Sequence, residues 1–120
     1  MRARGRGCII NVASQLDIKG GANLSPYCSV KAGIGGFTRA LAWEAAPKGV
    51  RVNAIAPGPV DTELVRRNPA EWREAFIARL PAGRFGTMEE IAATVLLLAG
   101  PHGGFYVGAT LSPNGGDIMY

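Results

Sequence analysis

The sequence predicts an α/β fold in which three parallel strands alternate with helices. Two short runs of β-branched and other apolar residues, 8–13 and 50–56, are typical of strands buried on both faces. A long helical pattern separates them, and strand, helix and strand in this order form a βαβ unit with parallel strands. The 120 residues, 48% hydrophobic and 18% charged, suit one small domain or part of one.

The first long helix is expected over residues 25–46, because apolar residues recur there at steps of three and four. The recurring residues are Val30, Ile34, Phe37, Leu41 and Ala45. The Pro-Lys-Gly sequence at 47–49 then ends the helix. Gly33, Gly35 and Gly36 lie inside it, although each costs about 1 kcal/mol relative to alanine. We therefore expect a close neighbour there, either a sheet, a second helix or a subunit interface.

A second helix follows the second strand. Pro57-Gly58-Pro59 ends that strand, since prolines cannot continue a β-ladder. Asn68 is the expected N-cap of a helix that runs to about residue 80, with Pro69 at its first position and Glu71 in its first turn.

A third helix and a third strand complete the pattern. Thr87 and Glu90 have the spacing of a capping box, which opens a helix. Its apolar side is formed by Ile91, Val95 and Leu98, and Gly100-Pro101 ends it. Residues 109–112 are expected to form a brief strand. In such a sheet, ligands bind outside the carboxyl ends of the strands, where Ser14 and the Pro57-Gly58 turn fall.

The charge and hydropathy of the sequence limit the kinds of partner that we expect the protein to bind. The formal net charge is +4, and Arg2, Arg4 and Arg6 form a small basic cluster. No aromatic residues interleave with these arginines, so we expect a solvated loop and no nucleic-acid partner. Nucleic-acid binding, with steep salt dependence, is the alternative. No apolar run approaches the roughly 20 residues that cross a bilayer, and residues 1–7 lack the apolar stretch of a signal peptide. We expect a cytoplasmic protein without a membrane partner.

The cysteines and the histidine give no sign of a metal site. Cys8 lies in an apolar run and Cys28 in a helical pattern, and neither has the CxxC spacing of a zinc site or a disulfide framework. We expect both to be buried, reduced thiols, and no metal. His102, between a proline and a glycine, is expected to be a surface residue of a loop.

Three residues form a candidate catalytic site. Tyr27 and Lys31 are four residues apart at the start of a helix, so they share one helix face. An ammonium 4 Å from a phenolate contributes about 4 kcal/mol at an effective dielectric constant of 20. Ser14, just past the first strand, would bring a second hydroxyl to the same crevice. We hypothesise that Ser14 positions a substrate oxygen, Tyr27 transfers its proton and Lys31 stabilises the phenolate.

Each of these residues also has a structural interpretation. The Tyr-x-x-x-Lys spacing alone is a weak signal, because aromatic and basic residues meet at helical spacing in many proteins. Taken separately, Ser14 is a turn residue, Tyr27 a helix-start aromatic residue and Lys31 a solvated charge. The three residues together are far less expected by chance.

The order and spacing of several motifs are similar to those of the classical short-chain dehydrogenase/reductase family. The motifs are NVAS at 11–14, PYCSVKAG at 26–33, RVNAIAPG at 51–58, VDT at 60–62, PAGRFG at 81–86, EEIA at 89–92 and NGG at 114–116. The resemblance covers essentially the entire chain. Within the family, the sequence most resembles 3-oxoacyl-[acyl-carrier-protein] reductases and related acyl-CoA reductases.

The resemblance implies the C-terminal part of a doubly wound, Rossmann-type fold and an oxidoreductase that uses NAD or NADP. Its substrate would be a small ketone or secondary alcohol, including a 3-oxoacyl thioester. Ser14, Tyr27 and Lys31 would be catalytic, with Lys31 also holding the nicotinamide ribose. The residues that would contact the cofactor are Tyr27, Lys31, Pro57, Gly58, Val60 and Thr62. For Pro57 and Gly58 a simple turn is the alternative.

The resemblance carries three further expectations. Residues from about 61 to 80 are similar to the family's mobile substrate lid, and Trp72, Phe76 and Leu80 would either cover an apolar substrate or belong to the core. The full-length protein would be a homodimer or homotetramer. Only thirteen residues precede Ser14, so we expect residues 1–120 to be a partial domain without the nucleotide-binding half. A catalytically inactive fragment that only oligomerises is the alternative function.

Overall fold

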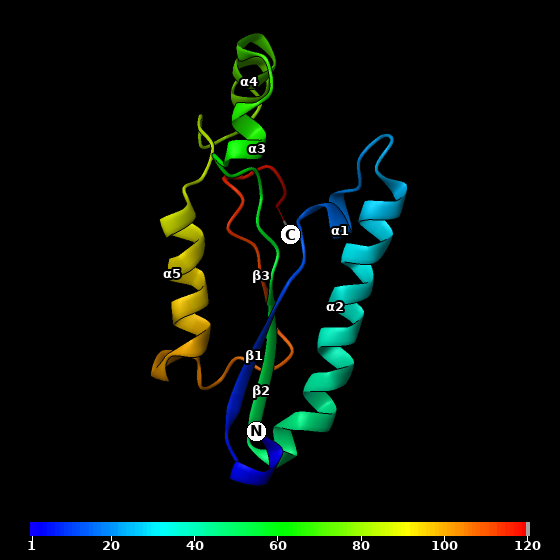
Figure 1. Cartoon of the computed structure of the whole chain (residues 1–120), viewed down its shortest axis with the longest axis vertical. Coiled ribbons are helices and arrows are strands. Elements are labelled where there is room, and N and C mark those ends of the chain that lie inside the picture. The colour runs from blue at the N-terminus through cyan, green and yellow to red at the C-terminus, as the bar shows by residue number, and fades with distance from the viewer. Residues whose placement is uncertain (120) are drawn as a thin grey trace.

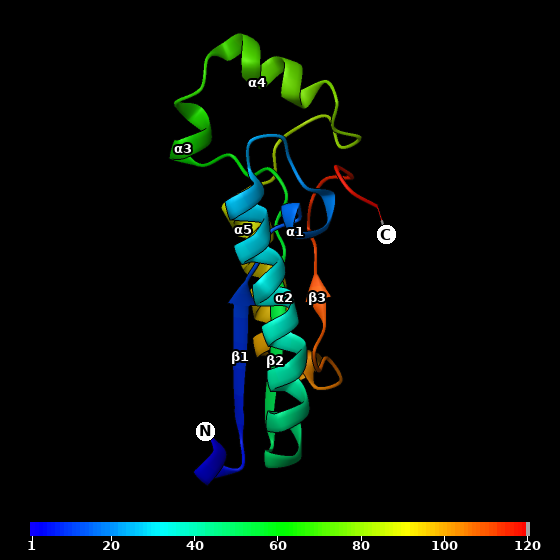
Figure 2. The ribbon, with the colours of Figure 1, turned by 90° about the vertical axis from the view of Figure 1, so that its right-hand side faces the viewer.

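The sheet of this protein has three parallel strands. The structure is a computed structural model that describes residues 1–119. The strands are β1 (Gly7–Val12), β2 (Val50–Ile55) and β3 (Thr110–Leu111), in the order β1-β2-β3. Six residue pairs connect β1 to β2, from Gly7 with Val50 to Val12 with Ile55. The three strands point the same way, so their carboxyl ends meet at one edge of the sheet (Figure 2).

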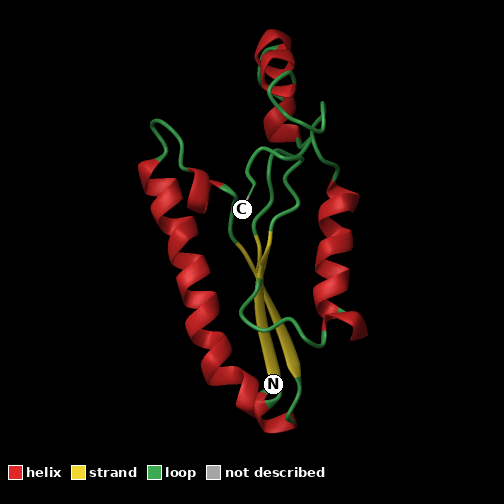
Figure 3. Cartoon of the chain, turned by 180° about the vertical axis from the view of Figure 1, so that it is seen from behind, coloured by secondary structure: helices red, strands yellow, loops and turns green. Residues whose placement is uncertain are grey.

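One long helix covers each face of the sheet. Helix α2 (Ser25–Ala45) packs on one face and helix α5 (Met88–Ala99) on the other (Figures 1 and 3). The result is a three-layer arrangement with helices on both sides of a parallel sheet, as in part of a doubly wound fold. This confirms the predicted fold class. The start of α2 lies at the same end as the carboxyl ends of the strands (Figure 1).

Strand β2 is the centre of the core. Five of its six residues are buried, and Val52 and Ala54 are fully inaccessible to solvent. Val50 and Val52 pack with Ala42 and Ala45 of α2. A strand between two neighbours and beneath helices on both faces needs apolar side chains on both faces. The β-branched run 50–56 therefore predicted this strand correctly, although it includes Arg51 and Asn53. The run 8–13 was also expected to be buried on both faces, but β1 lies at an edge of the described sheet, is only half-buried and leaves Val12 55% exposed.

The buried face of α2 differs from the apolar stripe that predicted the helix. Its buried residues are Gly35, Thr38, Ala42 and Ala45. In contrast, Val30 and Phe37 are 65% and 57% exposed. Small side chains let the helix approach the sheet closely. Thr38 is buried without cost because its Oγ1 donates to the Ile34 carbonyl (2.7 Å) and accepts from Asn11 Nδ2 (2.9 Å).

Two of the three glycines of α2 do not have the close neighbour that the sequence suggested. Gly35 is buried, and a Cβ there would lie 3.5 Å from Arg39 Nη1 and 3.7 Å from Asp17 Oδ2. At Gly33 and Gly36, a Cβ would meet no other atom within 4 Å. Gly35 therefore has neighbours inside the chain, but these ordinary van der Waals distances do not require a glycine there. A second copy of the chain stays a prediction for the other two.

Gly36→Ala tests whether that face of α2 is free. Alanine costs a helix interior less than glycine, so we expect the free energy of unfolding to rise by about 0.5–1 kcal/mol. Urea denaturation measures this change. A decrease would show that another surface packs against the bare backbone at Gly36 under the conditions of the experiment.

A buried asparagine fixes the approach to β3. Asn53 of β2 is fully buried, donates from Nδ2 to the Tyr106 carbonyl (2.8 Å) and accepts the Ala109 amide on Oδ1 (3.0 Å). Both of its polar atoms are therefore paired, as burial requires. The loop that leads into β3 is held against β2 by this side chain.

Two short helices were not predicted, and the helix that was expected to run to about residue 80 ends earlier. Helix α1 (Leu16–Lys19) follows β1, and α3 (Glu63–Arg66) precedes α4 (Ala70–Ile77). Helix α4 stops short of the expected residue 80, because Leu80 turns inward and is only 4% exposed.

The expected N-cap of α4 was wrong, although its first turn contains Glu71 as predicted. The Asn68 side chain turns back and donates to the Val65 carbonyl (3.0 Å), so it satisfies the end of α3. Pro69 takes the cap position of α4 and makes no side-chain cap hydrogen bond. An asparagine that follows one short helix and precedes another can serve either end, and the sequence alone does not decide between them.

Helix α5 begins with the predicted capping box. Thr87 Oγ1 accepts the Glu90 amide (3.2 Å), and Glu90 Oε2 accepts the Thr87 amide (2.8 Å). Arg84 donates to both carboxylate oxygens of Glu90, at 2.9 and 2.5 Å. These contacts, first the Arg84 hydrogen bonds and then the Thr87 amide, lower the pKa of Glu90 from 4.5 to about 2.

This lowered pKa gives the capping box a pH dependence. Because the folded pKa lies below the ordinary one, the carboxylate stabilises the fold fully above about pH 4.5, and the contribution is lost as the pH falls towards 2. We expect Glu90→Gln to lower the free energy of unfolding near neutral pH, with the difference from wild type vanishing near pH 2. Denaturant titrations across this range measure it. A pH-independent difference would contradict the expectation, and Glu89→Gln is the control for lost charge.

The remaining sequence expectations concern cysteines, metal and membrane. Both Cys8 and Cys28 are free thiols. We expected both to be buried, but each is only half-buried. Within residues 1–119, no three His, Cys, Asp or Glu side chains gather closely enough to hold a metal ion. No helix in the described part of the chain combines the length and the apolar character that crossing a bilayer requires.

Candidate active site

The loop after β1 places Ser14 at the carboxyl edge of the sheet. The chain continues alongside β2 beyond the last strand residue: the Ala13 amide donates to the Ile55 carbonyl (2.8 Å) and the Gln15 amide to the Pro57 carbonyl (3.2 Å). Ser14 lies between these two bonds and is only 7% exposed. Its backbone is therefore held from the β2 side, at the edge where a doubly wound sheet binds ligands.

The Ser14 hydroxyl is oriented by the next turn of chain. Its Oγ accepts the Leu16 amide at 3.2 Å, and the Ser14 carbonyl accepts the Asp17 amide at 2.9 Å. These bonds start helix α1. Because Oγ accepts from the backbone, its own proton is free to be donated to another oxygen. That is the state a substrate-positioning hydroxyl requires.

Tyr27 and Lys31 lie in the first two turns of α2. Helix α1, which follows Ser14, packs against this helix. Lys31 Nζ donates to the Val12 carbonyl at 2.9 Å and lies 5.6 Å from the centre of the Tyr27 ring. The ammonium therefore touches the end of β1, two residues before Ser14, and also stands beside the tyrosine. Tyr27 is 44% exposed, so its ring is open to a ligand.

Lys31 has the donors that a sugar would need. A lysine ammonium carries three N–H donors, and the Val12 carbonyl takes one of them. Within residues 1–119 the other two donors have no hydrogen-bond partner, and they could bind vicinal hydroxyl groups, such as those of a ribose. The geometry thus fits the expected holder of a nicotinamide ribose.

Pro57 and Gly58 form the turn at the carboxyl end of β2. The Gly58 amide donates to the Pro113 carbonyl at 3.0 Å. A Cβ at Gly58 would lie 2.5 Å from Asn114 Cα, far inside van der Waals contact. The absence of a side chain is thus required by the crossing of these two segments. The turn interpretation explains why residue 58 is glycine, and contact with a cofactor stays a prediction.

Val60 and Thr62 connect this turn to the next helix. Val60 forms a parallel bridge with Gly86, and Thr62 caps helix α3 by accepting the Val65 amide on Oγ1 (3.4 Å). The Thr62 hydroxyl proton is not used by this cap and can be donated to a ligand. Both residues therefore have a structural role, and contact with a cofactor stays a prediction for each.

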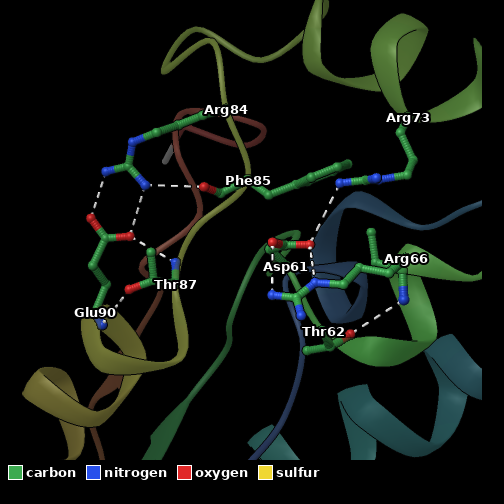
Figure 4. Close-up of polar contacts among 9 residues, drawn as sticks. Asp61, Thr62, Arg66, Arg73, Arg84, Phe85, Thr87 and Glu90 are labelled. Atoms are coloured by element: carbon green, nitrogen blue, oxygen red, sulfur yellow. Dashed lines mark hydrogen bonds and ion pairs between the residues drawn. The ribbon is translucent and has the colours of Figure 1, made fainter. Parts of the chain in front are cut away.

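Asp61 anchors the segment that resembles a lid. Its carboxylate accepts from Arg66 of α3 at 3.1 and 3.0 Å, and Arg73 of α4 lies 3.7 Å from it (Figure 4). The Arg66 hydrogen bonds are the main reason that the pKa of Asp61 lies below its usual value. One carboxylate thus ties both short helices to the end of β2. No periodic pattern in the sequence indicated this cluster, because α3 was not predicted.

Helices α3 and α4 project beyond the carboxyl edge of the sheet (Figures 1 and 2). Aromatic contacts connect α4 to the segment before α5. The ring centroids of Trp72 and Phe76 lie 5.2 Å apart, and those of Phe76 and Phe85 lie 5.7 Å apart. Trp72 is 43% exposed, whereas Leu80 is buried. The expected apolar face therefore divides, with Leu80 belonging to the core and Trp72 partly exposed to solvent.

Comparisons of the sequence with known proteins cover nearly the whole chain. The sequence profile of the family described as enoyl-(acyl carrier protein) reductase matches residues 1–117. The chain is 44% identical over 113 residues to the 3-oxoacyl-[acyl-carrier-protein] reductase of Pseudomonas aeruginosa, covering 94% of this chain and 46% of that protein. It is 46% identical over 120 residues to the acetoacetyl-CoA reductase of Shinella zoogloeoides, covering 99% of this chain and 50% of that protein.

A further relative acts on a different compound. The cis-4-hydroxycyclohexanecarboxylate dehydrogenase of Sinomonas cyclohexanicum is 46% identical over 116 residues, which are 97% of this chain and 47% of that protein. The chain spans about half the length of the curated relatives it matches.

Proposed function

Because the chain belongs to the short-chain dehydrogenase/reductase family, we propose that it carries the catalytic residues of a nicotinamide-dependent oxidoreductase. The reaction interconverts a ketone and a secondary alcohol. One observation carries the proposal: Lys31 stands between the Tyr27 ring and the end of β1, which leads to Ser14. A serine hydroxyl, a phenol and an ammonium are the groups needed to handle a carbonyl oxygen and its proton.

The three side chains have distinct roles in the proposed reaction. The Ser14 hydroxyl donates a hydrogen bond to the substrate oxygen, since its own Oγ is held by the Leu16 amide. The Tyr27 hydroxyl gives its proton to that oxygen in reduction and accepts it in oxidation. The Lys31 ammonium stabilises the resulting phenolate, because opposite charges attract strongly in a partly desolvated site. A bound nicotinamide supplies or accepts the hydride.

The cofactor is proposed to be NAD or NADP. Lys31 has two free donors for its ribose hydroxyl groups, and Tyr27 stands beside Lys31. The turn at Pro57 and Gly58 and the free Thr62 hydroxyl lie on the segment that continues from β2. These residues would contact the nicotinamide end, as cofactors bind beyond the carboxyl ends of parallel strands.

A 3-oxoacyl thioester is the proposed substrate class. The relatives from Pseudomonas aeruginosa and Shinella zoogloeoides are named for 3-oxoacyl and acetoacetyl substrates. The exposed Trp72 on α4 offers an apolar cover for an acyl chain. The proposed setting is the cytoplasm.

A non-catalytic, self-associating module is the second candidate. The outer face of α2 favours it, since Val30, Phe37 and Trp43 are 65%, 57% and 85% exposed. Exposed apolar side chains in one helix are typical of a surface that packs against another protein. Self-association is also proposed for the enzyme, so oligomeric state alone does not separate the two candidates.

Turnover separates them. The protein is purified together with the nucleotide-binding half that residues 1–120 are expected to lack. It is mixed with NADH or NADPH and with acetoacetyl-CoA or a simple cyclic ketone, and the nicotinamide absorbance is followed. We expect consumption of reduced cofactor, with a higher kcat/KM for the thioester than for the ketone. A higher value for the ketone would contradict the substrate class alone. A folded chain that consumes no cofactor with any carbonyl compound would contradict the enzymatic proposal.

A further inference from the structure

The C-terminal segment of the chain returns to the loop that carries Ser14. The Asp117 carboxylate accepts from Gln15 Nε2 on one oxygen and from Lys19 Nζ on the other. Its side chain is 11% exposed, against 39% for that of Lys19. Gln15 directly follows Ser14, and Lys19 is the last residue of α1. One carboxylate therefore holds both ends of the segment from Gln15 to Lys19.

We propose that Asp117 is a positioning residue, which holds the Ser14 hydroxyl in place by clamping helix α1. The inference rests on the proposed function, because it assigns Asp117 to the site in which Ser14 acts. Asp117 itself does not touch the reacting groups in this assignment. It acts through Gln15 and Lys19, and through the Leu16 amide that orients the serine Oγ.

Because Gln15 is buried, the contacts of Asp117 with Gln15 and Lys19 constrain the chain more strongly than an exposed ion pair would. Gln15 is 5% exposed, and its Oε1 is buried without a hydrogen-bond partner in the described part of the chain. Asp117 therefore supplies the hydrogen bond that its side-chain amide makes. A carboxylate can only accept, which fixes the amide with its NH₂ group towards Asp117. Without that acceptor, the NH₂ group would also lose its partner, both polar ends of a buried amide would be unpaired, and the loop would shift to hydrate them.

Strand β2 and the turn after it support the Ser14 loop from one side, and Asp117 supports it from the other side. The Pro57 carbonyl holds the Gln15 backbone from the sheet, whereas Asp117 holds the Gln15 side chain and the far end of α1. Ser14 lies at the start of this short helix, which has four residues and few hydrogen bonds of its own. Small displacements of a positioned group cost about 10²-fold in rate, so such support matters for turnover.

Asp117→Asn tests the assignment, since it keeps the size of the side chain and removes the charge. We expect kcat to fall about 10- to 100-fold while the affinity for reduced cofactor stays within about twofold, because Lys31 is anchored separately to Val12. Lys19→Gln removes one arm of the clamp at an exposed position and should lower kcat in the same direction by less. Glu44→Gln, which removes a carboxylate from the far end of α2, should leave both quantities unchanged.

Hydrogen exchange tests the clamp independently of turnover. The amides of Asp17, Ile18, Lys19 and Gly20 are bonded within this turn. In Asp117→Asn we expect them to exchange about tenfold faster, with the amides of β2 unchanged. Unchanged exchange in the turn, or an unchanged kcat, would overturn the inference. Absence of turnover in the wild-type chain would instead contradict the proposed function, so the two failures are distinguishable.

Discussion

Tyr27→Phe is expected to reduce turnover by about 10²- to 10⁴-fold, the range over which a positioned proton donor accelerates a reaction. The substitution removes only the hydroxyl that transfers the proton and leaves the ring beside Lys31. Tyr27 is 44% exposed, so the free energy of unfolding should change little. The rate of nicotinamide consumption with acetoacetyl-CoA measures the effect, and a denaturant titration of the same sample establishes that the variant is folded.

Tyr106→Phe is the matched control for this substitution. It removes the same atom from a tyrosine in the loop before β3, where the contact with Asn53 is made by the backbone carbonyl and not by the hydroxyl. We expect its turnover to equal that of wild type. Equal turnover of Tyr27→Phe and wild type would remove Tyr27 from the catalytic role.

Gly58→Ala is expected to lower the free energy of unfolding by about 1–3 kcal/mol, the usual cost of forcing extra volume into a packed site. The new Cβ would lie 2.5 Å from Asn114 Cα and 2.9 Å from the Asn114 carbonyl oxygen. Both are backbone atoms, which cannot move aside as a flexible side chain can. The two crossing segments must therefore separate, and the bond from the Gly58 amide to Pro113 would stretch or break.

The same change should reduce turnover, because the turn at Pro57 and Gly58 belongs to the proposed cofactor-binding segment. Urea denaturation and cofactor consumption measure the two effects in parallel. Gly36→Ala provides the comparison, since a methyl group there meets no atom of the chain and should stabilise the fold. If both glycine variants changed stability in the same direction, the close approach at Asn114 would not explain Gly58.

Local patterns were sufficient to predict most of the elements of the fold. The β-branched run of β2 and the capping box of Thr87 and Glu90 depend on residues close together in the sequence, and the structure confirms both. The turn after β2 was also placed correctly. The spacing of Tyr27 and Lys31 put them on one helix face, and the structure places the Lys31 ammonium beside the Tyr27 ring.

The buried face of α2 could not be predicted from hydrophobicity. The helix uses small side chains, including the hydrogen-bonded Thr38, to approach the sheet, and leaves the larger Phe37 at the surface. A pattern that ranks residues by apolar character favours phenylalanine over threonine for the core. The geometry of close packing reverses that choice here.

Polar contacts between residues far apart in the chain could not be predicted from the sequence either. Asp117 meets Gln15 although 102 positions separate them, and Asn53 holds the loop at Tyr106 and Ala109. Neither contact has a local spacing that reveals it, because the partners are brought together only by the parallel order of the strands. The role of Asp61 was hidden for a related reason, since one of its partners lies on the unpredicted helix α3.

The central claim is that these residues form a nicotinamide-dependent site. Titration with NADH and NADPH of purified protein that includes the expected nucleotide-binding half tests it most directly. We expect saturable binding of at least one cofactor, weakened about tenfold or more in Lys31→Met through the loss of charge-assisted hydrogen bonds. Lys48→Met, at an exposed position beyond the far end of α2, should bind as wild type does. A folded chain that binds neither cofactor, or binds one equally well without Lys31, would contradict the claim and favour the self-associating module.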